Sequence, residues 1–80
     1  MKIKVLGPGC PNCVTLERVT RQVLDVMGVE AEIEKVTDYA EILGYGVMST
    51  PGLVVDGTVV LAGRVPTPTK LRELLESVIR

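Results

Sequence analysis

Apolar residues follow two different spacings in the first half of the chain. They alternate with charged residues in residues 2–6 and again in residues 29–36, and this period of two is typical of a strand. Residues 14–27 instead place apolar side chains three and four positions apart, as on one face of a helix. The pattern predicts a strand, a helix over about 11–27 and a second strand. Two strands joined by a helix imply a parallel pair with a right-handed crossover.

The outer surfaces of these elements are expected to be charged. Glu17 and Arg21 lie four positions apart in the predicted helix, and we expect them to pair on its solvent side. Three glutamates alternate with other residues in the second run, at Glu30, Glu32 and Glu34. This spacing indicates a solvated face and is consistent with an edge strand.

A short helix and a β-hairpin are predicted in the middle of the chain. Thr37 or Asp38 can cap a helix over about 39–43. Two nearly all-apolar runs then flank Asp56-Gly57, a residue pair favoured in two-residue hairpin turns. Because neither run alternates with polar residues, we expect both hairpin strands in the interior of the sheet, covered on both faces.

A final helix is predicted at the end of the chain. Thr67 is a suitable cap, and Pro68 suits the first helical position, where its missing N–H would be unpaired anyway. An apolar stripe follows at helical spacing. Its residues are Leu71, Leu74, Leu75, Val78 and Ile79. The predicted order is strand, helix, strand, helix, strand, strand, helix, which describes one α/β domain over residues 1–80.

The chain has two cysteines, and they lie three positions apart where the first strand ends and the first helix begins. Pro11 suits the first helical position, which makes Cys10 the cap and places Cys13 one turn inside the helix. Unpaired N–H groups make this end of a helix positive, so the pKa of Cys10 is expected to fall from about 8.5 toward about 7 or below. Cysteines at this spacing are also close enough to form a disulfide.

Other roles for the cysteine pair stay open at this point. The spacing could be accidental, or the pair could form a structural disulfide, although a four-residue ring restrains the unfolded chain little. The chain has no histidine, and two cysteines alone cannot complete a tetrahedral zinc site. A metal role would therefore need Cu(I)-like coordination, arsenic or a dimer. A redox pair and a soft-metal or metalloid site remain as the two main alternatives.

Charge and composition narrow the expected partners. The net charge is −1 and basic residues do not cluster, so neither nucleic acid nor an anionic membrane is expected as the main partner. The absence of histidine excludes Ser-His and Cys-His catalytic pairs. The apolar run at the N-terminus is too short for the core of a signal peptide, so we predict a cytoplasmic protein. In that compartment a cysteine pair is expected to cycle rather than to stay oxidised.

Three motifs resemble those of the thioredoxin superfamily, in particular its short thioredoxin-like or glutaredoxin-like small redox-active disulfide proteins of bacteria and archaea. They are Gly7-Pro8-Gly9-Cys10-Pro11-Asn12-Cys13, Thr50-Pro51-Gly52-Leu53-Val54-Val55-Asp56-Gly57 and Ala62-Gly63-Arg64. The resemblance implies a thioredoxin-like fold, with a four-stranded mixed sheet flanked by three helices. The predicted order of elements agrees with it. In ferredoxin-like metal carriers, by contrast, the hairpin follows the first helix and the chain ends in a strand.

The resemblance also implies roles for individual residues. Cys10 would be the nucleophile and Cys13 the resolving cysteine of a thiol–disulfide oxidoreductase, with their disulfide in place of any cofactor or metal. The peptide bond before Pro51 is expected to be cis. The expected substrate-binding residues are Pro8, Gly9, Pro11, Thr50, Pro51 and Gly63.

The partners that the resemblance implies are a disulfide-containing protein substrate and an upstream thiol reductase. In glutaredoxins an acidic residue that helps to hold glutathione usually follows the glycine pair. Here Arg64 follows Gly63, which argues against glutathione as a partner.

Overall fold

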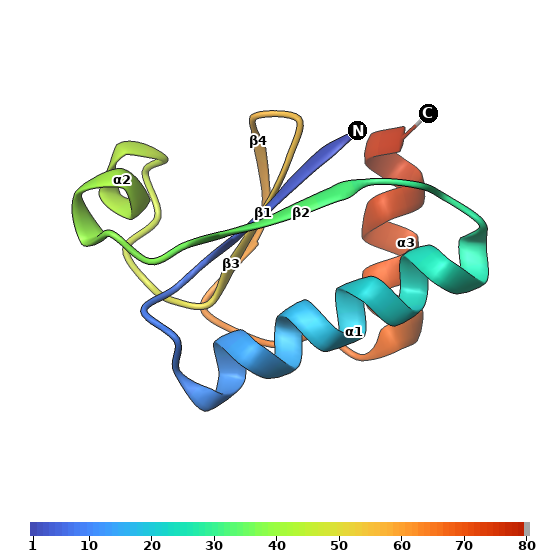
Figure 1. Ribbon diagram of the computed structural model, residues 1–80, viewed down its shortest axis with the longest axis horizontal. Helices are drawn as coiled ribbons and strands as arrows, with labels where there is room; N and C mark the ends of the chain where they lie inside the picture. The colour runs from blue at the N-terminus through green and yellow to red at the C-terminus, as the bar shows by residue number, and fades with distance from the viewer. Residues whose placement is uncertain (80) are drawn as a thin grey trace.

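Residues 1–79 form a four-stranded mixed sheet with helices on both faces, which confirms the predicted order of elements (Figure 1). The structure is a computed structural model that describes these 79 residues. The side chain of Ile79, which was predicted to belong to the apolar stripe, lies outside the described part of the chain. The second strand begins at Glu32 rather than at residue 29. The elements are β1 (Lys2–Leu6), α1 (Pro11–Met27), β2 (Glu32–Val36), α2 (Tyr39–Gly44), β3 (Gly52–Val55), β4 (Thr58–Ala62) and α3 (Pro68–Ile79).

The strand order β2-β1-β3-β4 brings two loops together at one end of the sheet. β1 pairs parallel with β2, as predicted, and antiparallel with β3, which in turn pairs antiparallel with β4. Leu6 at the end of β1 lies opposite Gly52 at the start of β3. The loop that follows β1 therefore meets the loop that precedes β3. The first of these loops leads to the cysteines, and the second contains Thr50 and Pro51.

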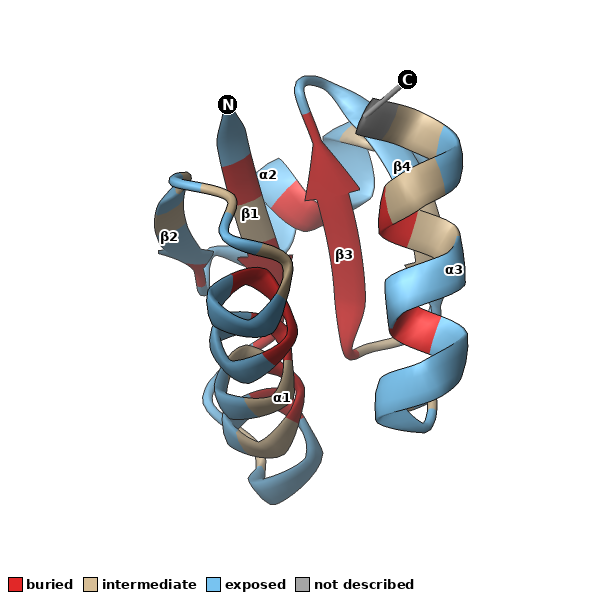
Figure 2. Cartoon of the chain, turned by 90° about the vertical axis from the view of Figure 1, so that its right-hand side faces the viewer, coloured by how far each residue is buried: buried red, intermediate tan, exposed pale blue. Residues whose placement is uncertain are grey.

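The hairpin has the predicted turn, but one of its strands lies elsewhere than expected. Asp56 and Gly57 have φ values of 47° and 86°, the left-handed pair of a two-residue turn. β3 is buried along its whole length, whereas β4 forms an edge of the sheet and is largely exposed (Figure 2). The expectation of two interior strands is therefore wrong for β4. Its apolar composition does not determine its place in the strand order.

Two apolar clusters cover the two faces of the sheet. α1 and α3 lie on one face and pack against each other, while α2 lies on the opposite face (Figure 1). Ile3 and Val5 point toward α1 and α3, and Leu6 points toward α2, because successive residues of a strand face opposite sides. The larger cluster consists of Ile3, Val5, Leu16, Val23, Leu24, Leu53, Val55, Leu71 and Leu75.

Side-chain caps determine where the helices begin. Oδ1 of Asp38 accepts a hydrogen bond of 3.0 Å from the N–H of Ala40, so Asp38 rather than Thr37 caps α2. Oγ1 of Thr67 accepts one of 3.2 Å from the N–H of Lys70, as predicted for α3. A cap of this kind typically contributes about 1 kcal/mol. The third helix start, that of α1, is capped by a sulfur atom.

Candidate active site

Cys10 and Cys13 form a disulfide at the start of α1. Cys10 is the N-cap of the helix, with φ −65° and ψ 161°, and Pro11 is the first helical residue. The two cysteine Cα atoms lie 5.0 Å apart. The backbone N–H of Cys13 donates a hydrogen bond of 3.2 Å to Sγ of Cys10. The cysteines thus have the cap position and the spacing that the sequence predicts.

The two sulfur atoms differ in access to solvent. Cys10 is partly exposed, whereas Cys13 is only 4% exposed. The first turn of α1 contains no acidic residue, so no side chain in that turn offsets the positive end of the helix. A sulfur that accepts an N–H bond at a helix start is stabilised as the thiolate, which lowers the pKa of a cysteine. The cysteine that a partner can reach is thus also the one whose anion the backbone favours.

Gly7 makes room for the buried sulfur. Its N–H donates to the carbonyl oxygen of Val36 at 2.9 Å, which ties the loop to β2. A Cβ on Gly7 would overlap Sγ of Cys13 and would lie 3.8 Å from Cβ of Thr50. Only glycine therefore fits while Cys13 occupies this place. From the sequence Gly7 is simply a turn residue, because no local pattern shows that a sulfur packs against it.

The loop before β3 lies beside the cysteines. The Thr50–Pro51 peptide bond is cis, and Thr50 lies next to Gly7 and hence near the buried sulfur. The carbonyl oxygen of Pro51 accepts a hydrogen bond of 2.8 Å from the N–H of Gly63. Gly63 has a φ of 85°, and a Cβ there would lie 3.1 Å from Cβ of Ser49. A side chain at position 63 would therefore crowd this loop.

Most of the predicted substrate-binding residues are accessible around the disulfide. Those exposed at least in part are Pro8, Gly9, Pro11, Thr50 and Gly63. Pro51 differs from them in being fully buried, and it leads directly into β3, which is buried throughout.

Two apolar side chains in or near these segments of the chain are exposed, and sequence reasoning missed both. Val14 is 55% exposed and lines a small cavity together with Cys13. Met48 is 93% exposed and lies two residues before Thr50. Val14 thus adds an exposed apolar side chain next to the buried cysteine.

An ion pair joins α1 to β2 one helical turn beyond Cys13. Nζ of Lys35 is 3.3 Å from Oε2 of Glu17, and the Glu17 side chain is only 12% exposed. The expected Glu17–Arg21 pair is therefore wrong, because Glu17 turns toward β2 and not toward solvent. Lys35 also lines a cavity of about 30 Å³ together with Cys13 and Thr37. The sequence offered one signal: Lys35 occupies the phase of the apolar positions of its strand.

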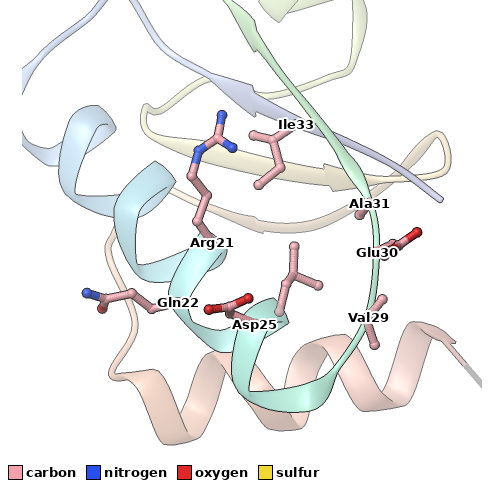
Figure 3. Close-up of a pocket in the computed structure, with 8 residues that line it drawn as sticks. Arg21, Gln22, Asp25, Val29, Glu30, Ala31 and Ile33 are labelled. Carbon is pink, nitrogen blue, oxygen red and sulfur yellow. The ribbon is translucent and has the colours of Figure 1, made fainter.

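A larger depression lies between the second half of α1 and the segment that leads into β2 (Figure 3). It measures about 570 Å³. Its lining residues are Arg21, Gln22, Leu24, Asp25, Val29, Glu30, Ala31 and Ile33. No cysteine lines it, so it lies apart from the disulfide. Within residues 1–79 no three His, Cys, Asp or Glu side chains are grouped as metal ligands. In that same part of the chain no helix is long and apolar enough to cross a membrane.

Comparisons with known proteins agree with this geometry. Residues 1–76 match the family model for the thioredoxin domain. A thioredoxin of Methanothermobacter thermautotrophicus is 39% identical over 75 residues, covering 94% of this chain and 97% of the relative. Two thioredoxins of Methanocaldococcus jannaschii are 36% and 30% identical; each match covers 94% of this chain, and 86% and 94% of the respective relative.

Proposed function

Because the chain belongs to the thioredoxin family and is a thiol–disulfide oxidoreductase, we propose that it reduces protein disulfides through a mixed disulfide on Cys10. The observation that carries this proposal is the unequal placement of the two sulfurs. Cys10 is partly exposed and receives an N–H at the helix start, while Cys13 is buried one turn deeper. An incoming disulfide therefore has access to Cys10 first.

The cycle has two exchange steps. The Cys10 thiolate attacks one sulfur of the substrate disulfide, forms a mixed disulfide and releases the other substrate sulfur as a thiolate. Cys13 loses its proton and attacks Sγ of Cys10, which breaks the mixed disulfide and releases the second substrate sulfur. Two electrons have then passed to the substrate, and the Cys10–Cys13 disulfide remains. An external thiol reductase must reopen it.

The surroundings of the disulfide support a protein as the substrate. The predicted substrate-binding residues carry no charge, and the exposed apolar side chain of Val14 follows Cys13 directly, which suits an extended segment of another protein. Glutathione is not favoured, because Arg64 stands where glutaredoxins have an acidic residue. We infer a cytoplasmic protein that needs no cofactor beyond its own disulfide. We expect its potential to be nearer the about −270 mV of thioredoxin than the about −120 mV of strong oxidants.

Trapping the intermediate tests the proposal. Reduced Cys13→Ser protein, mixed with a disulfide-bonded protein such as insulin, should retain a covalent adduct on Cys10 that mass spectrometry detects and a reductant releases. The matched control, Cys10→Ser combined with Cys13→Ser, should capture nothing. Absence of an adduct, together with absence of turnover by the wild type, would overturn the proposal. Stoichiometric Cu(I) or arsenic in an inactive reduced protein would favour the metal alternative.

A further inference from the structure

We propose that Arg64 makes the protein selective for substrates that carry a carboxylate beside the disulfide to be reduced. The inference rests on the proposed mixed-disulfide cycle and concerns which protein segments enter its first step. It assigns a role to an exposed cation that no ion pair within the described residues engages. Three observations carry it: the place of Arg64 in the sheet topology, its free guanidinium group and the distribution of charge around Cys10.

Arg64 lies in a loop at the same end of the sheet as the disulfide. The start of β3 pairs with the end of β1 on one side and with the end of β4 on the other. The segments that follow β1, precede β3 and follow β4 therefore meet at this end (Figure 1). Gly63 joins the last two, because its N–H donates to the carbonyl oxygen of Pro51 at 2.8 Å. Arg64 is the next residue along the chain.

The loop before β3 links this position with the cysteines. A Cβ at Gly7 would lie 3.8 Å from Cβ of Thr50 and would overlap Sγ of Cys13. Thr50 directly precedes the proline that binds the loop after β4. An extended segment rises by about 3.3 Å per residue. A side chain a few residues from the substrate cysteine can therefore come within reach of Arg64 while that cysteine is bonded to Cys10.

The Arg64 side chain is available to a partner. It is exposed, whereas the next residue, Val65, packs against the larger apolar cluster and anchors the loop. None of the ion pairs within residues 1–79 involves Arg64. A guanidinium group is planar and matches the two oxygens of a carboxylate with two parallel hydrogen bonds. The chemistry that this side chain recognises best is therefore an acidic side chain of the substrate.

The charge around Cys10 favours the same kind of partner. Residues 5–16, which contain the disulfide, and residues 42–55, which contain the loop before β3, have no charged side chain. Arg64 is the one charged residue in residues 57–69. The first turn of α1 has no acidic residue, so the helix start adds positive potential. These segments together present a positive potential, which attracts an anionic segment.

The other charged groups near this end of the sheet are engaged or more distant. Asp38 and Glu41 belong to the cap and first turn of α2, on the sheet face opposite to α1. Glu17 and Lys35 pair with each other at 3.3 Å. Arg18 is eight residues beyond the N-cap of α1, which is about 12 Å along the helix axis. That exceeds the Debye length of about 8 Å at physiological salt.

Arg64 would act on the first exchange step. Cys10 attacks as an anion, so a carboxylate beside the substrate disulfide repels it and slows the attack. An ion pair with Arg64 offsets this repulsion and holds the segment in place. The exchange itself is unchanged: the substrate disulfide breaks, the bond between Cys10 and one substrate sulfur forms, and the other sulfur leaves with the electron pair. Arg64 is thus a specificity-determining residue and takes no part in the bond changes.

Reduction of two charged peptides tests the inference. The peptides share one intramolecular disulfide and differ only in the residue beside it, which is glutamate in one and lysine in the other. Rapid quenching and mass spectrometry give the rate at which each oxidises the reduced protein. At low salt the wild type should react about five times faster with the glutamate peptide, as for one exposed ion pair. In 1 M salt the two rates should approach each other.

Variants at position 64 assign this preference to one side chain. Arg64→Gln should lower the ratio of the two rates to about one or below, and Arg64→Glu should invert the preference. Arg64→Lys keeps the charge and should retain part of the preference. The matched control is Arg21→Glu, which makes the same change in charge where Arg21 lines a depression without a cysteine (Figure 3). This control should keep the wild-type ratio.

The outcomes distinguish this inference from the proposed function. A wild type that reduces neither the peptides nor insulin contradicts the proposed function itself. Reduction of both peptides at equal rates, or a ratio that Arg64→Glu leaves unchanged, overturns the role of Arg64 alone. Oxidised glutathione carries carboxylates on a small molecule and should react more slowly than the glutamate peptide. A faster reaction with glutathione would contradict a protein segment as the acidic partner.

Discussion

Cys10 and Cys13 share one disulfide but lie in opposite surroundings. Cys10 is partly exposed at the end of a loop whose accessible residues carry no charge. Cys13 is 4% exposed, packs against Gly7 and shares a small cavity with Lys35. One sulfur is accessible to partners, and the other is enclosed within the fold, next to a small cavity that Lys35 also lines.

This difference shows how one helical turn can separate two chemical tasks. A nucleophile needs access and a stabilised anion, and Cys10 obtains both from its position as the N-cap. A resolving thiol needs protection from a second substrate, and burial against Gly7 provides that protection for Cys13.

The largest expected effect is a difference in reactivity between the two thiols. Limiting iodoacetamide should modify the reduced wild type almost entirely at Cys10, as measured by peptide mapping with mass spectrometry. A pKa lowered by about one unit gives about tenfold more thiolate near neutral pH, and the burial of Cys13 adds to this ratio. In denaturant the two cysteines should react alike. Equal modification in the folded protein would remove the distinction between them.

A smaller effect is expected from filling the space beside Cys13. Gly7→Ala should reduce the free energy of unfolding by about 1–3 kcal/mol, because the new Cβ overlaps Sγ of Cys13. Urea unfolding of the oxidised proteins measures it. Gly44→Ala in α2 is the control, since a Cβ there would meet nothing within 4 Å. In a Cys13→Ala background, which lacks this sulfur, the cost of Gly7→Ala should largely disappear.

Gly7 illustrates what the sequence could and could not predict about the site. The cysteine pair, the cap position and Pro11 are local features, so their arrangement follows from a strand that ends just before a helix begins. The packing of Gly7 on a sulfur six residues later depends on how the loop folds back. The Glu17–Lys35 pair is less predictable still, because it joins two elements whose spacing only the folded sheet determines.

The fold, too, was predictable only where it depends on local features of the sequence. α1 and the Asp56-Gly57 turn were predictable because helical periodicity and turn chemistry act over a few residues. The edge position of β4 was not, because strand order depends on pairing between distant segments. An apolar strand can lie at an edge when its neighbours in the sheet are more strongly apolar or better covered. β3 takes the central place here, between β1 and β4.

Replacing each cysteine by serine and by alanine should reveal the different surroundings of the two positions. The serine variant is expected to be the more stable at position 10, and the alanine variant at position 13. Cys10→Ser keeps an atom that can accept the N–H of Cys13, so it should be more stable than Cys10→Ala by about 1 kcal/mol. At Cys13 a buried hydroxyl has to find a partner, so Cys13→Ala should be the more stable of its pair. Urea unfolding of all four variants under reducing conditions measures both differences. The same order at both positions would contradict the assigned surroundings.

The smallest effect is expected on the sheet face that lies away from the disulfide. Nζ of Lys4 donates to Tyr45 Oη at 2.8 Å. This hydrogen bond, followed by the charge interaction with Tyr45, raises the pKa of Lys4 above its ordinary value of 10.5. Since the folded pKa is raised, the stability from this contact is present below the unfolded pKa and is lost as the pH rises through the folded one. The contact should therefore matter at neutral pH and fade only in strong alkali.

Lys4→Met thus offers a test of whether the sheet face opposite the disulfide takes part in its chemistry. Urea unfolding should show the wild type to be slightly more stable at neutral pH, with the two proteins converging as the pH rises through the raised pKa of Lys4. Disulfide reduction should proceed at the wild-type rate, because Lys4 faces the side of the sheet opposite to Cys13. Slower reduction by Lys4→Met would show that charge on the opposite face of the sheet influences the disulfide, and the different surroundings of the two cysteines would then not be enough to explain their reactivity.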